Sequence, residues 1–184
     1  MDKKEWRKEI ADRLERLEDR EEKELTALQH LYRLEQWEKA EVVAMTLSFR
    51  DEFRTDAILA SAFSAGKTVI LPKVIGREMR FFKVDEAHPY VINAMGIKEP
   101  GEGAEEVELK EADLCLVPGR AFTLEGDRLG WGGGYYDQAL SDYQGARVTV
   151  TFDEQVVNTL PTESFDERID LLITESGVHR CRTT

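Results

Sequence analysis

The glycine-rich segment 117–137 contains the residue types that bind phosphate groups. It holds six of the chain's thirteen glycines, namely Gly119, Gly126, Gly130, Gly132, Gly133 and Gly134. Glycines let the backbone turn tightly and direct several N–H groups at one oxyanion. The segment follows an apolar run typical of a strand and leads into a predicted helix. Because ligands of open α/β sheets bind beyond the carboxyl ends of strands, this segment predicts an anion site.

Two charged side chains in this segment suit phosphate chemistry. Arg128 carries a planar, permanently charged guanidinium that can bind a phosphate through two hydrogen bonds. The helix predicted to begin near Tyr135 adds the positive end of its dipole. Asp137 lies in the first turn of that helix, where the dipole alone favours a carboxylate. Beside a bound phosphate, the same carboxylate would be placed to hold Mg²⁺, and the two interpretations are compatible.

The pattern matches neither of the common nucleotide-binding motifs. A Walker loop would end in Gly-Lys-Ser/Thr, and a dinucleotide fingerprint would follow the strand directly. The alternative is a flexible loop in which the glycines serve only as turns. Trp131, Tyr135 and Tyr136 argue against a plain linker, because a linker rarely carries three large aromatic residues; they could also be core residues.

The elements that position this segment follow from the hydrophobic periodicity. Between residues 3 and 39, apolar residues recur at helical spacing, which indicates two amphipathic helices. After residue 40 the pattern changes to short apolar runs separated by helical stretches. We expect strands at 42–47, 68–71, 79–84, 114–117, 147–152 and 171–174, and helices at 55–65 and 135–143.

Strands that alternate with helices predict an α/β fold. We expect one three-layer domain over residues 1–184, with a mostly parallel or mixed central sheet and two N-terminal helices. Thr55 is expected to cap the helix that follows it, and Gly66 to end that helix. Pro72 is expected to stop the strand 68–71.

Length and charge exclude several classes of function. A chain of 184 residues is long enough to bury an ordinary core. Its net charge of -12 argues against a general nucleic-acid binder and against an anionic membrane surface, because both need cationic contacts. Acidity does not exclude small anionic substrates, since a few residues can reverse the local sign of charge.

The cysteines and histidines give little support for a metal site or for a nucleophilic mechanism. Cys115 and Cys181 form no metal-binding spacing, and three scattered histidines give little material for a zinc site. A Cys-His nucleophilic pair is possible in principle but has no spacing to support it. The charged N-terminus is not a secretory signal, and no run of about 18 apolar residues exists for a membrane span. We therefore expect a cytoplasmic protein; the sequence does not separate a monomer from a dimer.

Two stretches differ from the rest in charge. Residues 99–113 hold seven acids and one lysine, and they predict a solvated loop. Residues 67–83 hold one acid and five cations, which are Lys67, Lys73, Arg77, Arg80 and Lys83. These cations are either scattered surface charges or one wall of an anion site.

The residues of the glycine-rich segment also resemble a known family. Pro118-Gly119-x-Ala121-Phe122, followed by the run from Gly126 to Asp137, is similar to the signature of 5-formyltetrahydrofolate cyclo-ligases, also called 5,10-methenyltetrahydrofolate synthetases. The resemblance extends over nearly the whole chain. Weaker family motifs follow in the same order: Lys3-Lys4-x-x-Arg7, residues 48–52 with Thr55, Leu71-Pro72-Lys73, residues 100–103, Phe152-x-Glu154-Gln155 and Leu160-Pro161.

The resemblance implies a reaction that uses ATP and Mg²⁺. The family converts 5-formyltetrahydrofolate to 5,10-methenyltetrahydrofolate and releases ADP and phosphate. The formyl oxygen is phosphorylated, N10 attacks the activated carbon, and phosphate leaves. This chemistry asks for positioning and charge neutralisation and needs no covalent nucleophile.

The resemblance also implies a role for individual residues. Arg128 and Tyr135 would be catalytic. ATP would contact Lys3, Lys4, Arg7, Arg128, Leu129, Gly130, Gly132, Gly133, Gly134, Tyr135 and Tyr136. The folate would contact Leu47, Glu52, Trp131 and Tyr135, and Glu52 would accept hydrogen bonds from N–H groups of the pterin. The basic stretch 67–83 is suited to binding a polyglutamate tail of the substrate. Asp137 and Asp166 would be the metal ligands.

Two positions depart from the family pattern, and two other functions stay open. Phe165 stands where many members have histidine, and Arg120 replaces the usual small or apolar residue after Pro-Gly. One alternative function is a non-catalytic nucleotide- or folate-binding protein. The other is an enzyme such as a sugar-phosphate isomerase on a related scaffold, since fold alone does not fix function.

Overall fold

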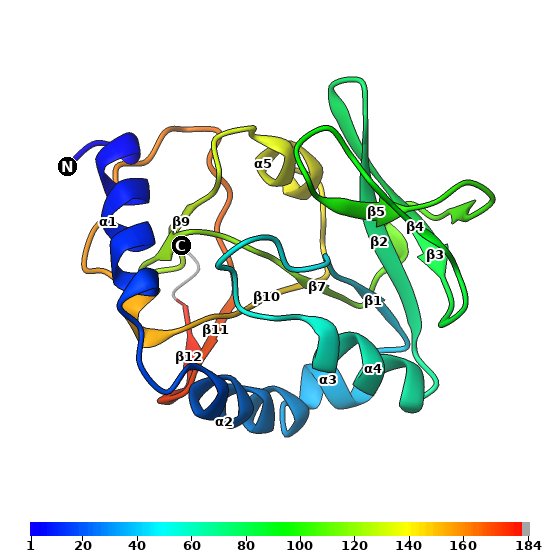
Figure 1. Ribbon diagram of the computed structural model, residues 1–184, viewed down its shortest axis with the longest axis horizontal. Helices are drawn as coiled ribbons and strands as arrows, with labels where there is room; N and C mark the ends of the chain where they lie inside the picture. Colours follow the sequence, from blue (N-terminus) through cyan, green and yellow to red (C-terminus); the bar gives the residue numbers. More distant parts are fainter. Residues whose placement is uncertain (182–184) are drawn as a thin grey trace.

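An eight-stranded sheet crosses the middle of the computed structural model, which describes residues 1–181 (Figure 1). The strand order is β12-β11-β10-β7-β1-β2-β3-β6. The strands are β1 (Val42–Ala44), β2 (Thr68–Ile75), β3 (Glu78–Val84), β6 (Glu105–Glu106), β7 (Leu114–Leu116), β10 (Ala146–Val150), β11 (Leu171–Thr174) and β12 (Gly177–Arg180). The five strands β11, β10, β7, β1 and β2 are parallel, and β3, β6 and β12 add antiparallel edges. The predicted mixed α/β sheet is therefore confirmed.

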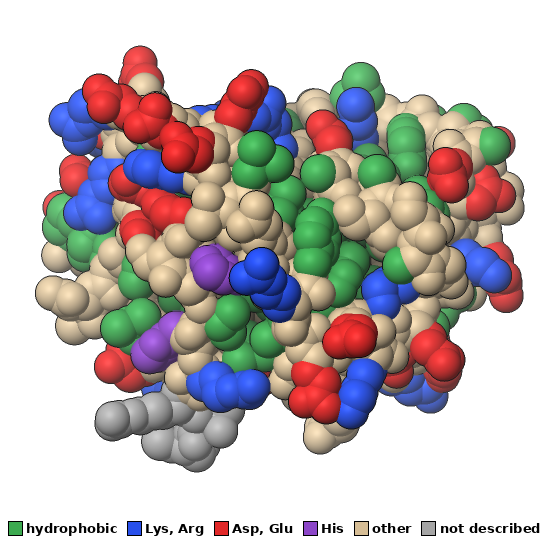
Figure 2. Space-filling view, turned by 90° about the horizontal axis from the view of Figure 1, so that it is seen from below, with side chains coloured by type: hydrophobic (Ala, Val, Ile, Leu, Met, Phe, Trp, Pro, Cys, Tyr) green, Lys and Arg blue, Asp and Glu red, His purple; other side chains and the backbone are tan. Residues whose placement is uncertain are grey.

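Helices cover both faces of this sheet. They are α1 (Lys3–Glu15), α2 (Arg20–Tyr32), α3 (Glu35–Lys39), α4 (Asp56–Ser64) and α5 (Tyr135–Leu140). In Figure 1, α2, α3 and α4 lie below the sheet and α5 lies above it. No helix within residues 1–181 is long and apolar enough to cross a membrane. In Figure 2, which shows the molecule from below, acidic and basic side chains are interspersed over the surface.

The consecutive apolar residues of the central strands contribute side chains to two separate hydrophobic cores. Leu114 and Leu116 of β7 pack with the core below the sheet, whereas Cys115 between them packs with the core above. Side chains alternate across a strand, so a strand covered on both faces must be apolar at every position. This explains why short apolar runs predicted these strands correctly.

The N-terminal region contains three helices where two were predicted. Leu34 has an extended backbone (φ -71°, ψ 131°) and separates α3 from α2. The side chain of Asp2 accepts a hydrogen bond from the Glu5 N–H, and the Glu5 side chain accepts one from the Asp2 N–H, so α1 begins with a capping box. This cap fixes the start of the helix that carries Lys3 and Arg7.

Several predicted boundaries were wrong. Strand β2 continues through Pro72 to Ile75. Its pairing with β1 ends at Ile70, so Pro72 meets no β1 partner that would need its missing N–H. Thr55 occupies the N-cap position of α4, but its hydroxyl accepts from the Ser48 N–H instead of capping the helix. Helix α5 ends at Leu140, three residues before the predicted limit.

The acidic stretch 99–113 is more ordered than a solvated loop. It contains part of β5 (Lys98–Pro100), all of β6 and a short 3₁₀ helix, η1 (Leu109–Glu111). Strand β5 pairs with β4 (Tyr90–Ile92) in a hairpin beside β2 (Figure 1). Glu99 is buried and accepts a hydrogen bond from the Val74 N–H. This acid therefore fastens the hairpin to the main sheet.

Candidate active site

The glycine-rich segment starts at the carboxyl end of β7 and folds back on itself before it reaches α5. Strands β8 (Ala121–Phe122) and β9 (Arg128–Leu129) form a short hairpin, and the turn Gly130–Gly134 leads from β9 into α5. Gly132 and Gly134 have φ of 114° and 73°, a region that favours glycine. The predicted loop between a strand and a helix is present, but the sequence did not predict the hairpin.

Helix α1, which is distant in the sequence, contacts this loop. The Nε of Arg7 donates to the Gly130 carbonyl at 2.8 Å, although the two residues are 123 positions apart. A Cβ placed on Gly132 would lie 3.5 Å from the Arg7 guanidinium. Lys4, on the same helix, is exposed to solvent. Of the N-terminal cations named by the resemblance, Arg7 therefore contacts the glycine turn, whereas Lys3 pairs with Glu163 and Asp166.

Arg128 is a buried cation at the base of the turn. Its side chain is 7% exposed, and its Nε donates to the Pro118 carbonyl at 2.6 Å. Its guanidinium lies 3.8 Å from the Asp137 carboxylate and 5.3 Å from the centre of the Tyr136 ring. Burial lowers the pKa of Arg128, and Asp137 opposes that shift. A cation held in this way is poised to neutralise an incoming phosphate.

Asp137 and Asp166 lie on adjoining segments. Asp137 accepts a hydrogen bond from the backbone N–H of Glu167 at 2.9 Å, next to Asp166 in the chain. Asp166 accepts from Lys3 Nζ at 3.0 Å, and Lys3 also binds Glu163 at 3.1 Å. Burial lowers the pKa of Lys3, but these two carboxylates outweigh it and raise the pKa overall.

The donor set at these two aspartates suits a hard cation. Among residues 1–181, no group of three or more His, Cys, Asp and Glu side chains forms a complete metal cage. Mg²⁺ in proteins is commonly held by one or two carboxylates, with substrate phosphate oxygens and water supplying the rest. Asp137 and Asp166 therefore fit a magnesium ion that arrives with a nucleotide. Phe165, which stands in the place of the family's histidine, is exposed beside Lys3.

Glu52 is the second chemical centre of the site. It lies after β1, is buried, and accepts hydrogen bonds from the Phe49 N–H at 2.6 Å and from the Trp131 indole Nε1 at 3.2 Å. Burial raises the pKa of Glu52, and these two donors oppose the shift. Since Trp131 belongs to the glycine turn, this contact joins the two predicted binding regions.

The other predicted folate residues take different positions. Trp131 is 40% exposed, and its ring meets Phe49 edge-on at 5.6 Å. Tyr135 lies against the glycine turn, where a Cβ on Gly133 would come within 2.7 Å of its ring. Leu47 is buried in the lower core. Leu47 is therefore part of the apolar packing beneath the loop after β1, and its contact with a folate stays a prediction.

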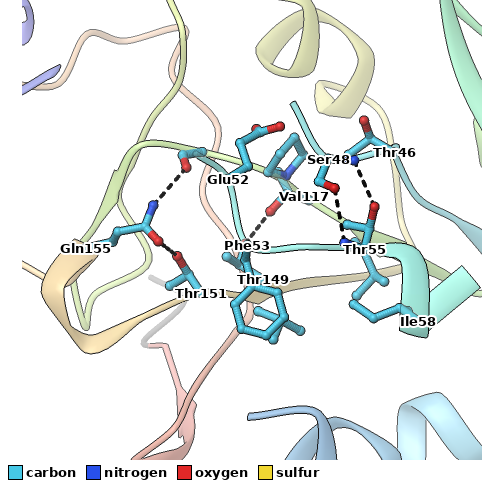
Figure 3. Close-up of a pocket in the computed structure, with 14 residues that line it drawn as sticks. Thr46, Ser48, Glu52, Phe53, Thr55, Ile58, Val117, Thr149, Thr151 and Gln155 are labelled. Carbon is cyan, nitrogen blue, oxygen red and sulfur yellow. Dashed lines mark hydrogen bonds between the residues drawn. The ribbon is translucent and has the colours of Figure 1, made fainter. Parts of the chain in front are cut away.

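A recess opens at the carboxyl ends of β1, β7 and β10 (Figure 3). Glu52 borders it, together with hydroxyl and amide side chains on neighbouring segments: Thr46, Ser48, Thr55, Thr149, Thr151 and Gln155. Gln155 donates to the carbonyls of Gly119 and Arg120 and accepts from Thr151, as Figure 3 shows in part. The recess holds about 40 Å³ of space.

Sequence reasoning missed several polar groups at this edge. Thr46 and Thr151 lie just beyond the ends of β1 and β10, a position that could have identified them, whereas Thr149 lies within β10 between two valines. The Tyr136 hydroxyl is buried and lies near the Thr46 side chain, but it makes no hydrogen bond of good geometry within residues 1–181; burial raises its pKa. A buried hydroxyl without a partner is costly, so this group is available as a donor to a ligand.

Comparison with known proteins gives a consistent family assignment. The sequence model of the 5-formyltetrahydrofolate cyclo-ligase family matches residues 1–175. A probable 5-formyltetrahydrofolate cyclo-ligase of Schizosaccharomyces pombe is 32% identical over 80% of this chain and 81% of its own length. The 5-formyltetrahydrofolate cyclo-ligase of Haemophilus influenzae is 32% identical over 82% of this chain and 84% of its own.

Solved structures agree with the sequence relatives. The 5,10-methenyltetrahydrofolate synthetase of Aquifex aeolicus has a TM-score of 0.87 and 35% identity, over 100% of this chain and 95% of that one. The synthetase of Mycoplasma pneumoniae, at 22% identity and a TM-score of 0.76, shares the fold over 95% of this chain and 99% of its own. The chain belongs to the 5-formyltetrahydrofolate cyclo-ligase family and is an enzyme of the cyclo-ligase type.

Proposed function

We propose that this enzyme converts 5-formyltetrahydrofolate to 5,10-methenyltetrahydrofolate, with ATP as the phosphoryl donor and Mg²⁺ as the metal. The observation that carries the proposal is the contact of one glycine turn with both chemical centres. Arg7 and Arg128 flank the turn, and Trp131 within it binds Glu52. A phosphate held by the turn and a folate held at Glu52 are therefore neighbours.

In this proposal, the ATP phosphates lie on the turn Gly130–Gly134. The Arg128 guanidinium neutralises the transferred phosphoryl group from below, and Lys3, Lys4 and Arg7 approach from α1. Lys3 is bound to Asp166 and Glu163, so it compensates those carboxylates when no metal is bound. Asp137 and Asp166 hold the metal, which supplies charge neutralisation for the phosphates when bound. Leu129 and Tyr136 complete this side of the site.

The pterin ring of the folate is placed against Glu52. A carboxylate can accept two N–H donors from an aminopyrimidine edge. The Trp131 indole N–H binds one Glu52 oxygen. Because a carboxylate oxygen has two lone pairs, we expect the indole to stay in place and to share that oxygen with the pterin. Trp131 and Tyr135 then cover the folate from the glycine turn.

The reaction then needs positioning more than acid–base chemistry. The formyl oxygen attacks the γ-phosphorus of ATP, and the bond between the β-phosphate oxygen and that phosphorus breaks to release ADP. N10 attacks the activated formyl carbon, the carbon–oxygen bond to phosphate breaks, and N10 loses its proton. Arg128 and Tyr135 are the residues that we propose to stabilise the charge on the transferred group. A preorganised cation does this without a covalent nucleophile.

Further parts of the proposal concern the substrate and the setting of the enzyme. Lys73 lies half-buried near the β4–β5 hairpin, with Nζ 3.5 Å from the Pro100 carbonyl, and Arg77 is exposed beyond it. We propose that these two cations attract a polyglutamate tail. Lys67 does not belong to this group, because its Nζ binds the Trp37 and Ala40 carbonyls. Residues 1–184 would act as one cytoplasmic domain.

The test is a turnover assay on the purified chain. ADP formation and the absorbance of the methenyl product are followed together, with Mg²⁺ and again after chelation. We expect both signals only when the folate, ATP and Mg²⁺ are all present. Folded protein that binds ATP and folate without product would instead indicate the non-catalytic binder. Turnover of a sugar phosphate without ATP would indicate the isomerase.

A further inference from the structure

Arg120 is the largest fully buried side chain of the molecule within residues 1–181, and it lies outside the residue set assigned to ATP, folate and metal. Its side chain is 2% exposed. Both terminal nitrogens donate to the Asp51 carboxylate, at 2.7 and 3.0 Å. Asp51 belongs to the loop after β1, next to Glu52, whereas Arg120 follows β7. The forked pair therefore joins the loops that leave two neighbouring parallel strands.

The same guanidinium also contacts the glycine turn. It lies 4.1 Å from the centre of the Trp131 ring, within the distance of a cation–π interaction. Trp131 is 40% exposed and stands between Gly130 and Gly132, which offer no side chain to restrain it. Its indole is oriented by three contacts: the Arg120 guanidinium, the Phe49 ring at 5.6 Å and the Glu52 oxygen at 3.2 Å.

Arg120 itself is held on more than one side. Its backbone N–H donates to the Leu129 carbonyl at 2.7 Å, and its carbonyl accepts from the Gln155 side chain at 3.1 Å. Because the Arg120 guanidinium is fixed in this way and the Trp131 ring is partly exposed, the position of the guanidinium can determine the orientation of the ring. Its charge also favours the ionised form of Glu52.

We propose that Arg120 is a positioning residue that holds the Trp131 indole over Glu52 and thereby sets the affinity of the enzyme for the pterin ring. This inference rests on the proposed function. Arg120 would act on the folate through Trp131, without touching ATP. Loss of Arg120 should therefore weaken folate binding selectively, whereas loss of a merely structural ion pair would not.

The central experiment compares steady-state kinetics of the wild type and of Arg120→Met. We expect the KM for 5-formyltetrahydrofolate to rise on the order of ten-fold, since a desolvated cation–π contact is of that size. The KM for ATP should stay within about two-fold, and kcat should change much less than the folate KM. The matched control is Lys67→Met, which removes a cation stacked on Trp37 far from the site and should leave both KM values unchanged.

A double-mutant cycle separates positioning from a general effect of the buried charge. Trp131→Leu removes the ring that Arg120 contacts, so Arg120→Met should have little further effect on the folate KM in that background. If Arg120→Met does not fold, Asp51→Asn weakens the same pair from its partly exposed side. It should raise the folate KM in the same direction.

The indole N–H of Trp131 gives an independent readout. With ¹⁵N-labelled tryptophan, the Nε1 resonance that disappears in Trp131→Phe should shift in Arg120→Met and stay in place in Lys67→Met. An unchanged folate KM and an unchanged resonance in folded Arg120→Met would overturn the proposal. Equal rises in both KM values would also overturn it. Absence of turnover in the wild type would instead contradict the proposed function.

Discussion

At the scale of single residues, the site depends on two charges with opposite tasks. Glu52 is an acid whose burial opposes ionisation, and Arg128 is a buried cation without a close bidentate carboxylate. In the proposed function, a pterin would compensate the first and a phosphate would compensate the second. Each side chain therefore carries a buried charge that the proposed substrates would compensate further.

The pKa of Glu52 gives a prediction about pH. Burial raises it above the usual 4.5, so the carboxylate takes up its proton at a higher pH than an exposed glutamate when the pH falls. The groups that act on this carboxylate are Trp131, Phe49, Arg120, Asp51 and Tyr136. Since protonation removes the charge that accepts the pterin donors, the KM for the folate should rise as the solution is acidified through this pKa.

Measurement of the folate KM from neutral to acid pH tests this expectation. In Glu52→Gln the KM should be high at neutral pH and nearly independent of pH below it. The KM for ATP serves as the internal control and should not follow the same curve. A folate KM that stays constant in the wild type down to the stability limit would contradict the role of Glu52.

Arg128 gives a prediction about geometry. Arg128→Lys keeps a positive charge but loses the planar fork and the bond from Nε to the Pro118 carbonyl. We expect kcat to fall on the order of 100-fold, the size found when a preorganised donor is removed. Thermal unfolding of the variant should be compared first, because the residue is buried. A folded variant with unchanged kcat would exclude Arg128 from phosphoryl transfer.

At the scale of elements, short strands bring distant segments to one edge of the sheet. The loops after β1, β7 and β10 supply Glu52, the glycine-rich segment and Gln155. Helix α1 reaches that edge from 120 or more positions away. Parallel strands make this possible, because their carboxyl ends lie together whatever their order in the chain.

Predictions of secondary structure from the sequence were most accurate where the packing is simple. Apolar runs such as Leu171–Thr174 predicted buried strands, because both faces of these strands meet a core. Prediction failed at Pro72, where strand β2 pairs with a neighbouring strand on one side only. It also failed at the β8–β9 hairpin, whose two-residue strands are too short to show an alternation of apolar and polar residues. The position of the glycine turn between a strand and a helix was predictable from the local sequence. The contacts of Arg7 with Gly130 and of Lys3 with Asp166 were not, since no local pattern pairs such distant residues.

The glycine turn allows a matched pair of variants. Gly134 and Gly66 have almost the same φ, 73° and 74°, and a Cβ on either would meet nothing within 4 Å. Alanine should therefore cost each about 1 kcal/mol of folding stability from left-handed strain alone. Only Gly134→Ala should also raise the KM for ATP several-fold, because Gly134 is the N-cap residue of α5 in the proposed phosphate site. Equal KM values in the two variants would argue that the turn does not bind ATP.

At the scale of the whole molecule, the core above the sheet encloses both thiols. Cys115 and Cys181 are buried free cysteines, and burial raises their thiol pKa to about 12 and about 11. Since the thiolate is the reactive form, neither should react with an alkylating reagent at neutral pH in the folded enzyme. This also argues against a cysteine nucleophile in the reaction.

The measurement is the rate of thiol labelling against denaturant concentration. Labelling of Cys115, in the central strand, should follow global unfolding and should slow when ATP and folate together stabilise the native state. Labelling of Cys181, near the described end of the chain, should also be slow without denaturant. Rapid alkylation of Cys115 in native enzyme would contradict the burial described for β7.

The central claim is that one glycine turn brings ATP and 5-formyltetrahydrofolate together for phosphoryl transfer. The most direct measurement records ADP and the methenyl product in the same reaction, with each substrate limiting in turn. The account predicts one ADP for each methenyltetrahydrofolate, and no ADP when either the folate or Mg²⁺ is withheld. ADP released at the same rate without folate, or methenyl product formed without ATP, would contradict it.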